Sequence, residues 1–288
     1  MGRSKLEFVL AMLIFGLNGV LASAIPWHSY EIVLARTTVG ALTMLAILRW
    51  QRRRFAILRS RGALWLTLGS GVLMGISWLG LYEAYTRLGV GLAQMLSSSG
   101  PAVAMVLSPL IFREKLQRTK VIGFAVVLTG MLLISSEDLT GGQAFGLLCG
   151  LLACLAYAAF LICNHRPLPM TPAERTMWQL VTASVIVMAF IAYRGTGLPD
   201  TFAPRALIAA LILGVVNTGL ATSMMFAALQ KIPMQTVGIL AYLEPMSAIV
   251  FSALLLGEQL GPLQLGGVAL ILGGTAFAEL YPGRHGRG

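Results

Sequence analysis

Charged residues are scarce in this chain, and acidic ones are the scarcest. Of its 288 residues 11% are charged and 57% are hydrophobic, with 11 Asp and Glu against 21 Lys and Arg. A soluble domain carries about 25% charged residues, so the composition excludes one and predicts an integral membrane protein. The net charge of +10 does not indicate nucleic-acid binding. The basic residues lie between hydrophobic runs, where they orient a protein in the lipid bilayer.

Residues for catalysis or metal binding are equally few. The three histidines fall in predicted loops or in the tail, so no intramembrane Ser–His pair is available. Cys149, Cys154 and Cys163 share one apolar segment, match no metal-binding spacing, and are expected to pack as small hydrophobic side chains. Asp138 and Asp200 lie in predicted loops, and neither a P-loop nor an HExxH motif occurs. We therefore expect no enzyme, no cofactor and no metal.

Long apolar runs are what the chain does have. A membrane-spanning helix needs about 20 predominantly apolar residues, and the sequence predicts an all-α membrane protein with ten such helices. They are Leu6–Ile25, Glu31–Arg49, Ala63–Arg87, Gly91–Phe112, Thr119–Ser136, Ala144–Cys163, Arg175–Tyr193, Pro204–Leu229, Gln235–Leu256 and Pro262–Leu280.

One stretch of the sequence, residues 82–133, occurs twice, because the segment from Phe226 onward repeats its pattern without a gap. The aligned pairs are Pro101 with Pro245, Ser108 with Ser252, Glu114 with Glu258, Leu116 with Leu260, Gly123 with Gly267 and Gly130 with Gly274. This predicts two five-helix repeats, 1–138 and 139–288. Five is an odd number, so the second repeat enters the membrane from the opposite face. Such inverted repeats are typical of carriers with a site at the repeat interface.

Lys and Arg are distributed unevenly over the predicted loops. With a cytoplasmic N-terminus, most basic residues fall on the cytoplasmic side, and only Arg87, Arg194 and Arg205 fall outside. Cytoplasmic loops carry the excess of basic residues, so both termini are predicted to be cytoplasmic.

Pro101 and Pro245 occupy matching central positions of the fourth and ninth predicted helices. An interior proline kinks a helix, and the hydroxyls of Ser97–Ser99 can satisfy the carbonyls that a kink frees. Two interpretations stay open. The prolines are either simple sites of helix curvature or hinges in the wall of a transport cavity.

Only three charged residues fall clearly inside the predicted helices: Arg36, Glu83 and Glu244. Such charges are costly and normally face a partner or a wet cavity. Arg36 and Glu83 both lie roughly 6–8 Å below the outer surface, which predicts a buried ion pair, structural or gating. Glu244 lies deeper, next to Pro245, with no cation at its depth. It is either protonated and hydrogen-bonded within the packing, or it binds a substrate ammonium group or a proton.

Aromatic side chains provide the remaining candidates. Trp78, Tyr82 and Tyr85 follow the spacing of one helix face, which fits either packing against core and lipid or the wall of a cavity. Rings, hydroxyls and few fixed charges suit a small amphipathic or zwitterionic solute. The candidate substrate-binding residues are Asn18, Trp78, Tyr82, Ser97, Ser98, Ser99, Tyr157, Trp178, Tyr242 and Glu244.

The ten helices, the paired prolines and the pattern Pro245, Gly257-Glu258, Leu260, Gly267 and Gly274 resemble the EamA family of the drug/metabolite transporter superfamily. The first copy has Arg113 in place of the glycine before Glu114. Leu243-Glu244-Pro245 is similar to a triplet of the YddG-type amino-acid exporters in that family. The resemblance implies efflux across the bacterial cytoplasmic membrane. It also implies a central cavity between helices one, three, four, six, eight and nine.

We therefore expect a secondary transporter that exports amino acids, aromatic ones included, by alternating access. The nearest alternative is an exporter of another small metabolite or a drug. A membrane-embedded enzyme and a passive channel are the more distant ones.

Overall fold

The computed structural model describes residues 2–52, 55–57, 60–88, 93, 96–114, 117–134, 144–195, 199, 203–257 and 261–281. Within these ranges it is all-helical, without strands. Its helices are α1 (Arg3–Gly16), α2 (Asn18–Ser23), α3 (Ser29–Trp50), α4 (Arg61–Leu88), α6 (Gly100–Phe112), α7 (Arg118–Ile134), α8 (Ala144–His165), α9 (Pro172–Arg194), α10 (Pro204–Ile212), the π-helix η2 (Leu213–Ala221), α11 (Thr222–Leu229), α12 (Met234–Leu240), α13 (Leu243–Leu256) and α14 (Pro262–Leu280).

Seven helical stretches of the described residues are long and apolar enough to cross a membrane, and each matches one of the predicted spans. The fourth and tenth predicted spans contain shorter apolar helices, Leu96–Phe112 and Leu265–Ala278, and the fifth contains the 17-residue helix α7. The fourth and fifth of these spans, Gly91–Phe112 and Thr119–Ser136, extend partly outside the described residues. Leucines exposed on α8 are what a lipid-facing surface requires; they are Leu147, Leu148, Leu151, Leu152 and Leu155.

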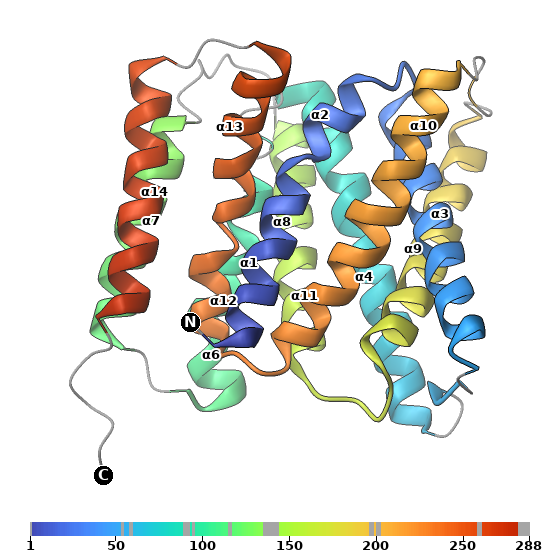
Figure 1. Ribbon diagram of the computed structural model, residues 1–288, viewed down its shortest axis with the longest axis horizontal. Coiled ribbons are helices and arrows are strands. Elements are labelled where there is room, and N and C mark those ends of the chain that lie inside the picture. Colours follow the sequence, from blue (N-terminus) through green and yellow to red (C-terminus); the bar gives the residue numbers. More distant parts are fainter. Residues whose placement is uncertain are drawn as a thin grey trace.

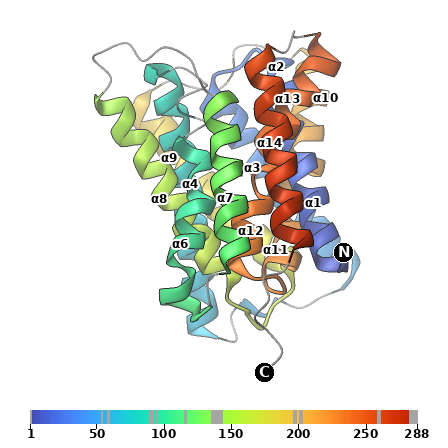
Figure 2. The same cartoon turned by 90° about the vertical axis from the view of Figure 1, so that its left-hand side faces the viewer.

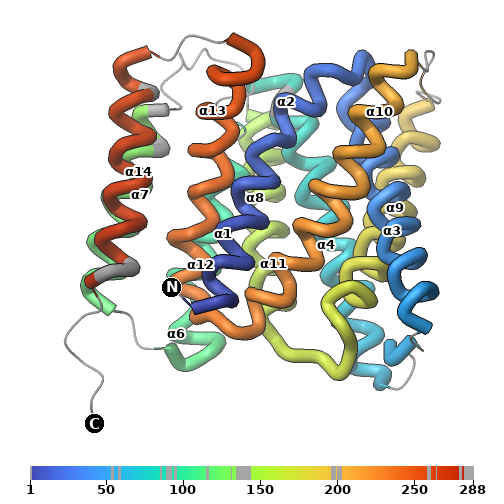
Figure 3. Tube along the Cα trace, viewed as in Figure 1, coloured from blue at the N-terminus to red at the C-terminus, as the bar shows by residue number. Residues whose placement is uncertain are grey.

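Successive helices run in alternating directions through a bundle about one helix length high (Figure 1). The pair α7 and α14 forms one edge, as the turned view also shows (Figure 2), and α3, α9 and α10 form the other edge. Between them, α1 packs against α11, α13 and η2, while α4 packs against α8 and α9. The tube view shows that α1 begins and α14 ends at the same end of the bundle, the lower one in this view (Figure 3).

Glycines allow α7 and α14 to approach closely. A Cβ on Gly274 would lie 2.8 Å from the Gly123 carbonyl oxygen, and one on Gly130 would lie 2.7 Å from that of Gly267. Small residues at membrane helix interfaces permit such backbone contact, and van der Waals packing then holds the pair together.

Pro101 and Pro245 lie at helix starts rather than in the middle of continuous helices. Pro101 is in the first turn of α6, after a break at Ser99, and Pro245 is in the first turn of α13, after the break between α12 and α13. Proline is favoured there because its missing N–H would have no helical partner. The expected interior kinks are therefore interruptions of the two helices.

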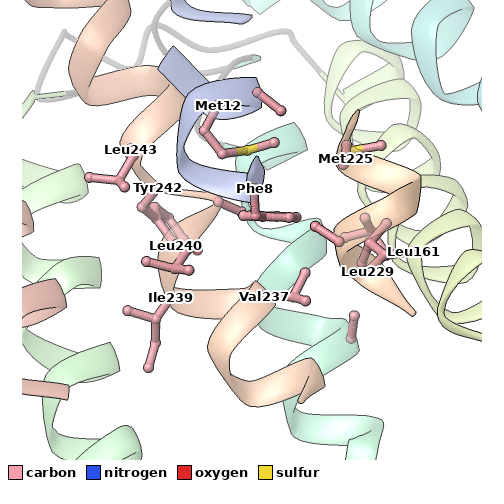
Figure 4. Packing of buried hydrophobic residues seen from close by; sticks show 14 of the residues in the cluster. Phe8, Met12, Leu161, Met225, Leu229, Val237, Ile239, Leu240, Tyr242 and Leu243 are labelled. Atoms are coloured by element: carbon pink, nitrogen blue, oxygen red, sulfur yellow. The ribbon is translucent and has the colours of Figure 1, made fainter. Parts of the chain in front are cut away.

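The largest apolar core lies where the broken segment α12–α13 meets α1, α8 and α11 (Figure 4). Phe8 and Met12 of α1 pack there with Val237 and Leu240 of α12. Tyr242, 1% exposed, belongs to the same cluster. The break is thus held by close apolar packing on this side.

Candidate functional site

Arg36 of α3 is the centre of a buried polar cluster. Its Nε donates to the Thr218 hydroxyl at 2.8 Å and its Nη2 donates to the Asn217 side-chain oxygen at 3.2 Å. The guanidinium lies 4.8 Å from the ring centroid of Trp78 and is also hydrogen-bonded to Tyr82. Neutral oxygens and an aromatic face therefore compensate this charge, which is only 5% exposed.

The acceptors Asn217 and Thr218 both lie in the π-helix η2. The Asn217 amide also donates to the Ile14 carbonyl oxygen at 2.6 Å, close to Leu17, where α1 gives way to α2. π-helical turns often occur at functional sites. Here the turn carries the side chains that join α1, α3 and η2 through hydrogen bonds.

Glu244 lies in the first turn of α13 and is half-buried. Among the described residues its carboxylate has no hydrogen bond and no ion pair. Arg36 acts on it electrostatically, and Glu244 acts in turn on the phenol of Tyr157, also half-buried. The sequence indicates no obvious cation at the depth of Glu244, and in the structure the charge of Arg36, from α3, acts on it.

The predicted ion pair between Arg36 and Glu83 is replaced by other contacts. Glu83 of α4 accepts a hydrogen bond from Arg194 of α9, and its second oxygen lies 3.8 Å from the Arg87 Nε. Arg36 instead bonds to the side chains of η2. The prediction of this ion pair relied on the depth of the two residues alone. In the structure, Glu83 of α4 lies against the end of α9.

The other candidates lie in several parts of the bundle. Trp78 and Tyr82 join Arg36, and Tyr157 joins Glu244, as described above. Ser97–Ser99 precede the break before α6, and a Cβ on the next residue, Gly100, would lie 2.8 Å from the Tyr157 ring. The serine segment thus borders Tyr157.

Two aromatic candidates lie elsewhere. Tyr242 is buried in the apolar core, where its ring lies 6.1 Å from that of Phe124 and its hydroxyl has no hydrogen-bond partner among the described residues. Trp178 packs edge-on against Phe55 in a separate cluster, 5.9 Å between centroids. Asn18 lies at the start of α2, and its buried side-chain oxygen has no hydrogen-bond partner in the described part of the chain.

Sequence reasoning missed that Asn217 and Thr218 would bind Arg36. The available signal was two adjacent polar residues in an otherwise apolar span that also contains glycines. It also missed Arg175, 0% exposed, whose guanidinium donates to the carbonyl oxygens of Cys163, Asn164 and Arg166 at the end of α8. Its position at the start of α9 made it look like a loop residue.

These features define a multi-pass, all-helical membrane protein with a buried polar cluster between its helices. The sequence matches the EamA-like transporter family over residues 5–136 and again over residues 144–279. The chain belongs to this family, within the drug/metabolite transporter superfamily, and the family's named members are transporters.

Named relatives agree with that assignment. A "probable amino-acid metabolite efflux pump" of Salmonella typhimurium is 25% identical over 279 residues, 92% of this chain and 91% of the relative. The "threonine/homoserine exporter RhtA" of Escherichia coli K12 is 25% identical over 246 residues, 85% of this chain and 80% of the relative. A solved crystal structure with 16% sequence identity shares the fold, with a TM-score of 0.85 over 97% of this chain and 98% of that one.

Proposed function

We propose that this protein exports amino acids, aromatic ones included, across the bacterial cytoplasmic membrane by alternating access. The observation that carries the proposal is the half-buried carboxylate of Glu244 in the first turn of α13, which has no hydrogen bond and no ion pair among the described residues. An ionisable residue inside a membrane protein is a candidate for solute or proton binding. The names of the two relatives above support amino acids as the solute.

The proposed architecture is ten helices in two inverted five-helix repeats, 1–138 and 139–288; their boundary lies outside the described residues. Helix pairing supports it. In the proposed repeats, α1–α2 corresponds to α8, α3 to α9, α4 to α10–α11, α6 to α12–α13 and α7 to α14. The contact between α4 and α8 then has its counterpart in the contact between α11 and α1. In the same way α6·α8 corresponds to α13·α1, and all four pairs are in contact. The family match to each half supports the same division.

Two details of the repeat alignment support the same symmetry. Gly123 corresponds to Gly267 and Gly130 to Gly274, so the contact of Gly123 with Gly274 is the counterpart of the contact of Gly267 with Gly130. The cap positions also correspond: Arg113 ends α6 with φ 57° and Gly257 ends α13 with φ 73°. Both backbones are left-handed at the same point of the repeat.

We further propose that the solute path lies between the repeats, with both termini in the cytoplasm, as the excess of basic residues in the predicted cytoplasmic loops supports. The breaks before Pro101 and Pro245 would act as hinges. The proposed binding residues of this path are Asn18, Trp78, Tyr82, Ser97, Ser98, Ser99, Tyr157 and Glu244. Tyr242 and Trp178, packed in apolar clusters, are proposed to support its walls.

Counterflow in proteoliposomes tests this function. Vesicles loaded with one unlabelled amino acid are diluted into each of a panel of radiolabelled amino acids. We expect saturable uptake that is accelerated by solute on the opposite side. Linear, unsaturable flux would indicate a channel, and a chemically altered solute would indicate an enzyme; either result contradicts the proposal.

A further inference from the structure

Positive charge is concentrated where α3 ends and α4 begins, at the lower end of the bundle in Figure 1. The sequence has six arginines from position 49 to position 61, with no Asp or Glu among them. The structure describes three of these arginines, Arg49, Arg52 and Arg61, and all three are exposed. Among the described residues, their side chains form no ion pair and no hydrogen bond. The described part of the chain therefore leaves these charges without a carboxylate.

The connection between α3 and α4 is fixed on its inner side by α9. Glu174, 2% exposed, lies in the first turn of α9 and accepts hydrogen bonds from the backbone N–H groups of Ala56 at 2.6 Å and Ile57 at 2.9 Å. The ring of Phe55 packs edge-on against Trp178, 5.9 Å between centroids. Glu174 thus anchors the backbone of the connection, and within the described ranges it forms no ion pair with the arginines.

The outer side of the same region continues the lipid-facing surface of two predicted membrane spans. Exposed residues recur every four positions, as Leu42, Ala46 and Trp50 on α3 and as Gly69, Trp65 and Arg61 on α4. Residues four apart share one face of a helix. Trp50 is 87% exposed and Trp65 is 71% exposed, and tryptophan is enriched where the membrane meets water. We therefore expect the neighbouring arginines to lie at the level of the lipid headgroups.

We propose that this surface binds the headgroups of anionic phospholipids in preference to zwitterionic ones. The surface, called here the Arg–Trp surface, consists of Arg49, Trp50, Arg52, Arg61 and Trp65. Guanidinium groups match phosphate oxygens in geometry and charge, and clusters of basic residues next to membrane spans attract anionic lipids. A lipid fits better than a free anion because the exposed tryptophan rings adjoin the arginines and offer contact to its acyl chains. This inference goes beyond the proposed function and does not depend on which solute is transported.

The test is quenching of tryptophan fluorescence by brominated lipids. The full-length protein is reconstituted into phosphatidylcholine vesicles that contain a minor fraction of dibrominated phosphatidylglycerol or, separately, the same fraction of dibrominated phosphatidylcholine. The signal of the Arg–Trp surface is the part of the quenching that disappears in Trp50→Phe/Trp65→Phe. We expect the phosphatidylglycerol to quench this part at least about twofold more strongly than the phosphatidylcholine. With Arg49→Gln, Arg52→Gln and Arg61→Gln combined, the two lipids should quench it equally.

The matched control combines Arg118→Gln, Arg166→Gln and Lys231→Gln. It removes three exposed cations at the same end of the bundle, where α7 begins and where α8 and α11 end. The control should keep the preference for phosphatidylglycerol, and thermal unfolding midpoints establish that both triple variants are folded.

Equal quenching by the two lipids in the wild-type protein would overturn the proposal. An equal loss of preference in both triple variants would overturn it as well, because the preference would then follow net charge and not this surface. Inorganic phosphate should leave the preference intact. If phosphate abolishes it while sodium chloride of the same ionic strength does not, the surface binds free anions and the lipid proposal is wrong. None of these measurements involves transport, so amino-acid export is tested separately.

Discussion

At the scale of single residues, Arg36 shows how neutral groups of neighbouring helices can compensate a buried cation. Two neutral oxygens of η2 and the face of Trp78 supply its compensation. Cation–π contact gains strength when it is desolvated. Among the described residues the carboxylate of Glu244 forms no hydrogen bond and no ion pair, which is why it is proposed to meet the solute.

Removing Asn217 should weaken this cluster. Asn217→Ala deletes the acceptor for Arg36 and the donor to the Ile14 carbonyl, so we expect a loss of about 1–2 kcal/mol in unfolding free energy. Denaturant unfolding in detergent micelles measures it. Ser184→Ala is the control, since its hydroxyl donates to the Leu180 carbonyl of its own helix. An equal loss in both variants would contradict the role of Asn217.

The helix caps at Arg113 and Gly257 predict stability changes of opposite sign. A left-handed backbone costs roughly 1–2 kcal/mol for a residue with a Cβ, so Arg113→Gly should stabilise the protein by about 0.5–1 kcal/mol after the greater chain entropy of glycine is counted. Gly257→Ala should destabilise it by about 1 kcal/mol. Thermal unfolding monitored by intrinsic fluorescence gives both signs, and a destabilised Arg113→Gly would show that its side chain matters more than the strain.

Residue identities predicted the intramembrane charges but not their partners. Hydropathy and helix rise predict similar depths for Arg36 and Glu83. Whether the two side chains pair also depends on the direction in which each one points from its helix. That direction follows from packing: α4 contacts α9, so Glu83 meets Arg194. The two acceptors of Arg36 in η2 lie 181 and 182 residues further along the chain, beyond the reach of any local pattern.

At the scale of helices, apolar run length predicted the long spans, because burial of about 20 apolar residues leaves few alternatives. The irregularities were harder to predict. The interruption at Leu17 and the π-helix Leu213–Ala221 carry no proline. Contacts with neighbouring helices stabilise them, among them the bond from Asn217 to Ile14. Pro101 and Pro245 indicated the positions of the other two breaks, but each lies in the first turn of a new helix and not at a kink within a continuous one.

Adjacent glycines in α14 provide a matched test of helix packing. A Cβ on Gly274 would collide with the Gly123 carbonyl of α7, whereas one on Gly273 would meet no atom within 4 Å. We expect Gly274→Ala to cost about 1–3 kcal/mol by overpacking and Gly273→Ala to be neutral or stabilising by up to about 1 kcal/mol. The two unfolding midpoints should therefore move apart. If they move together, α7 and α14 do not meet at these glycines.

At the scale of the whole molecule, the proposed inverted symmetry relates the start of α4 to the start of α10. Arg61 and Arg205 occupy corresponding positions of the repeat alignment, and both are exposed. In a chain without its native cysteines, an impermeant maleimide should label Arg205→Cys in intact cells and Arg61→Cys only after permeabilisation. Labelling of both from one side would contradict inverted repeats, which require corresponding helices to start on opposite faces.

The central claim is that a solute passes between the two halves and meets Glu244 on its way. Amino-acid counterflow by Glu244→Gln in proteoliposomes tests it most directly, with Glu83→Gln reconstituted in parallel and unfolding midpoints confirming that both variants are folded. The account predicts at least a tenfold loss of exchange in Glu244→Gln and near wild-type exchange in Glu83→Gln. Wild-type exchange by a well-folded Glu244→Gln would contradict it.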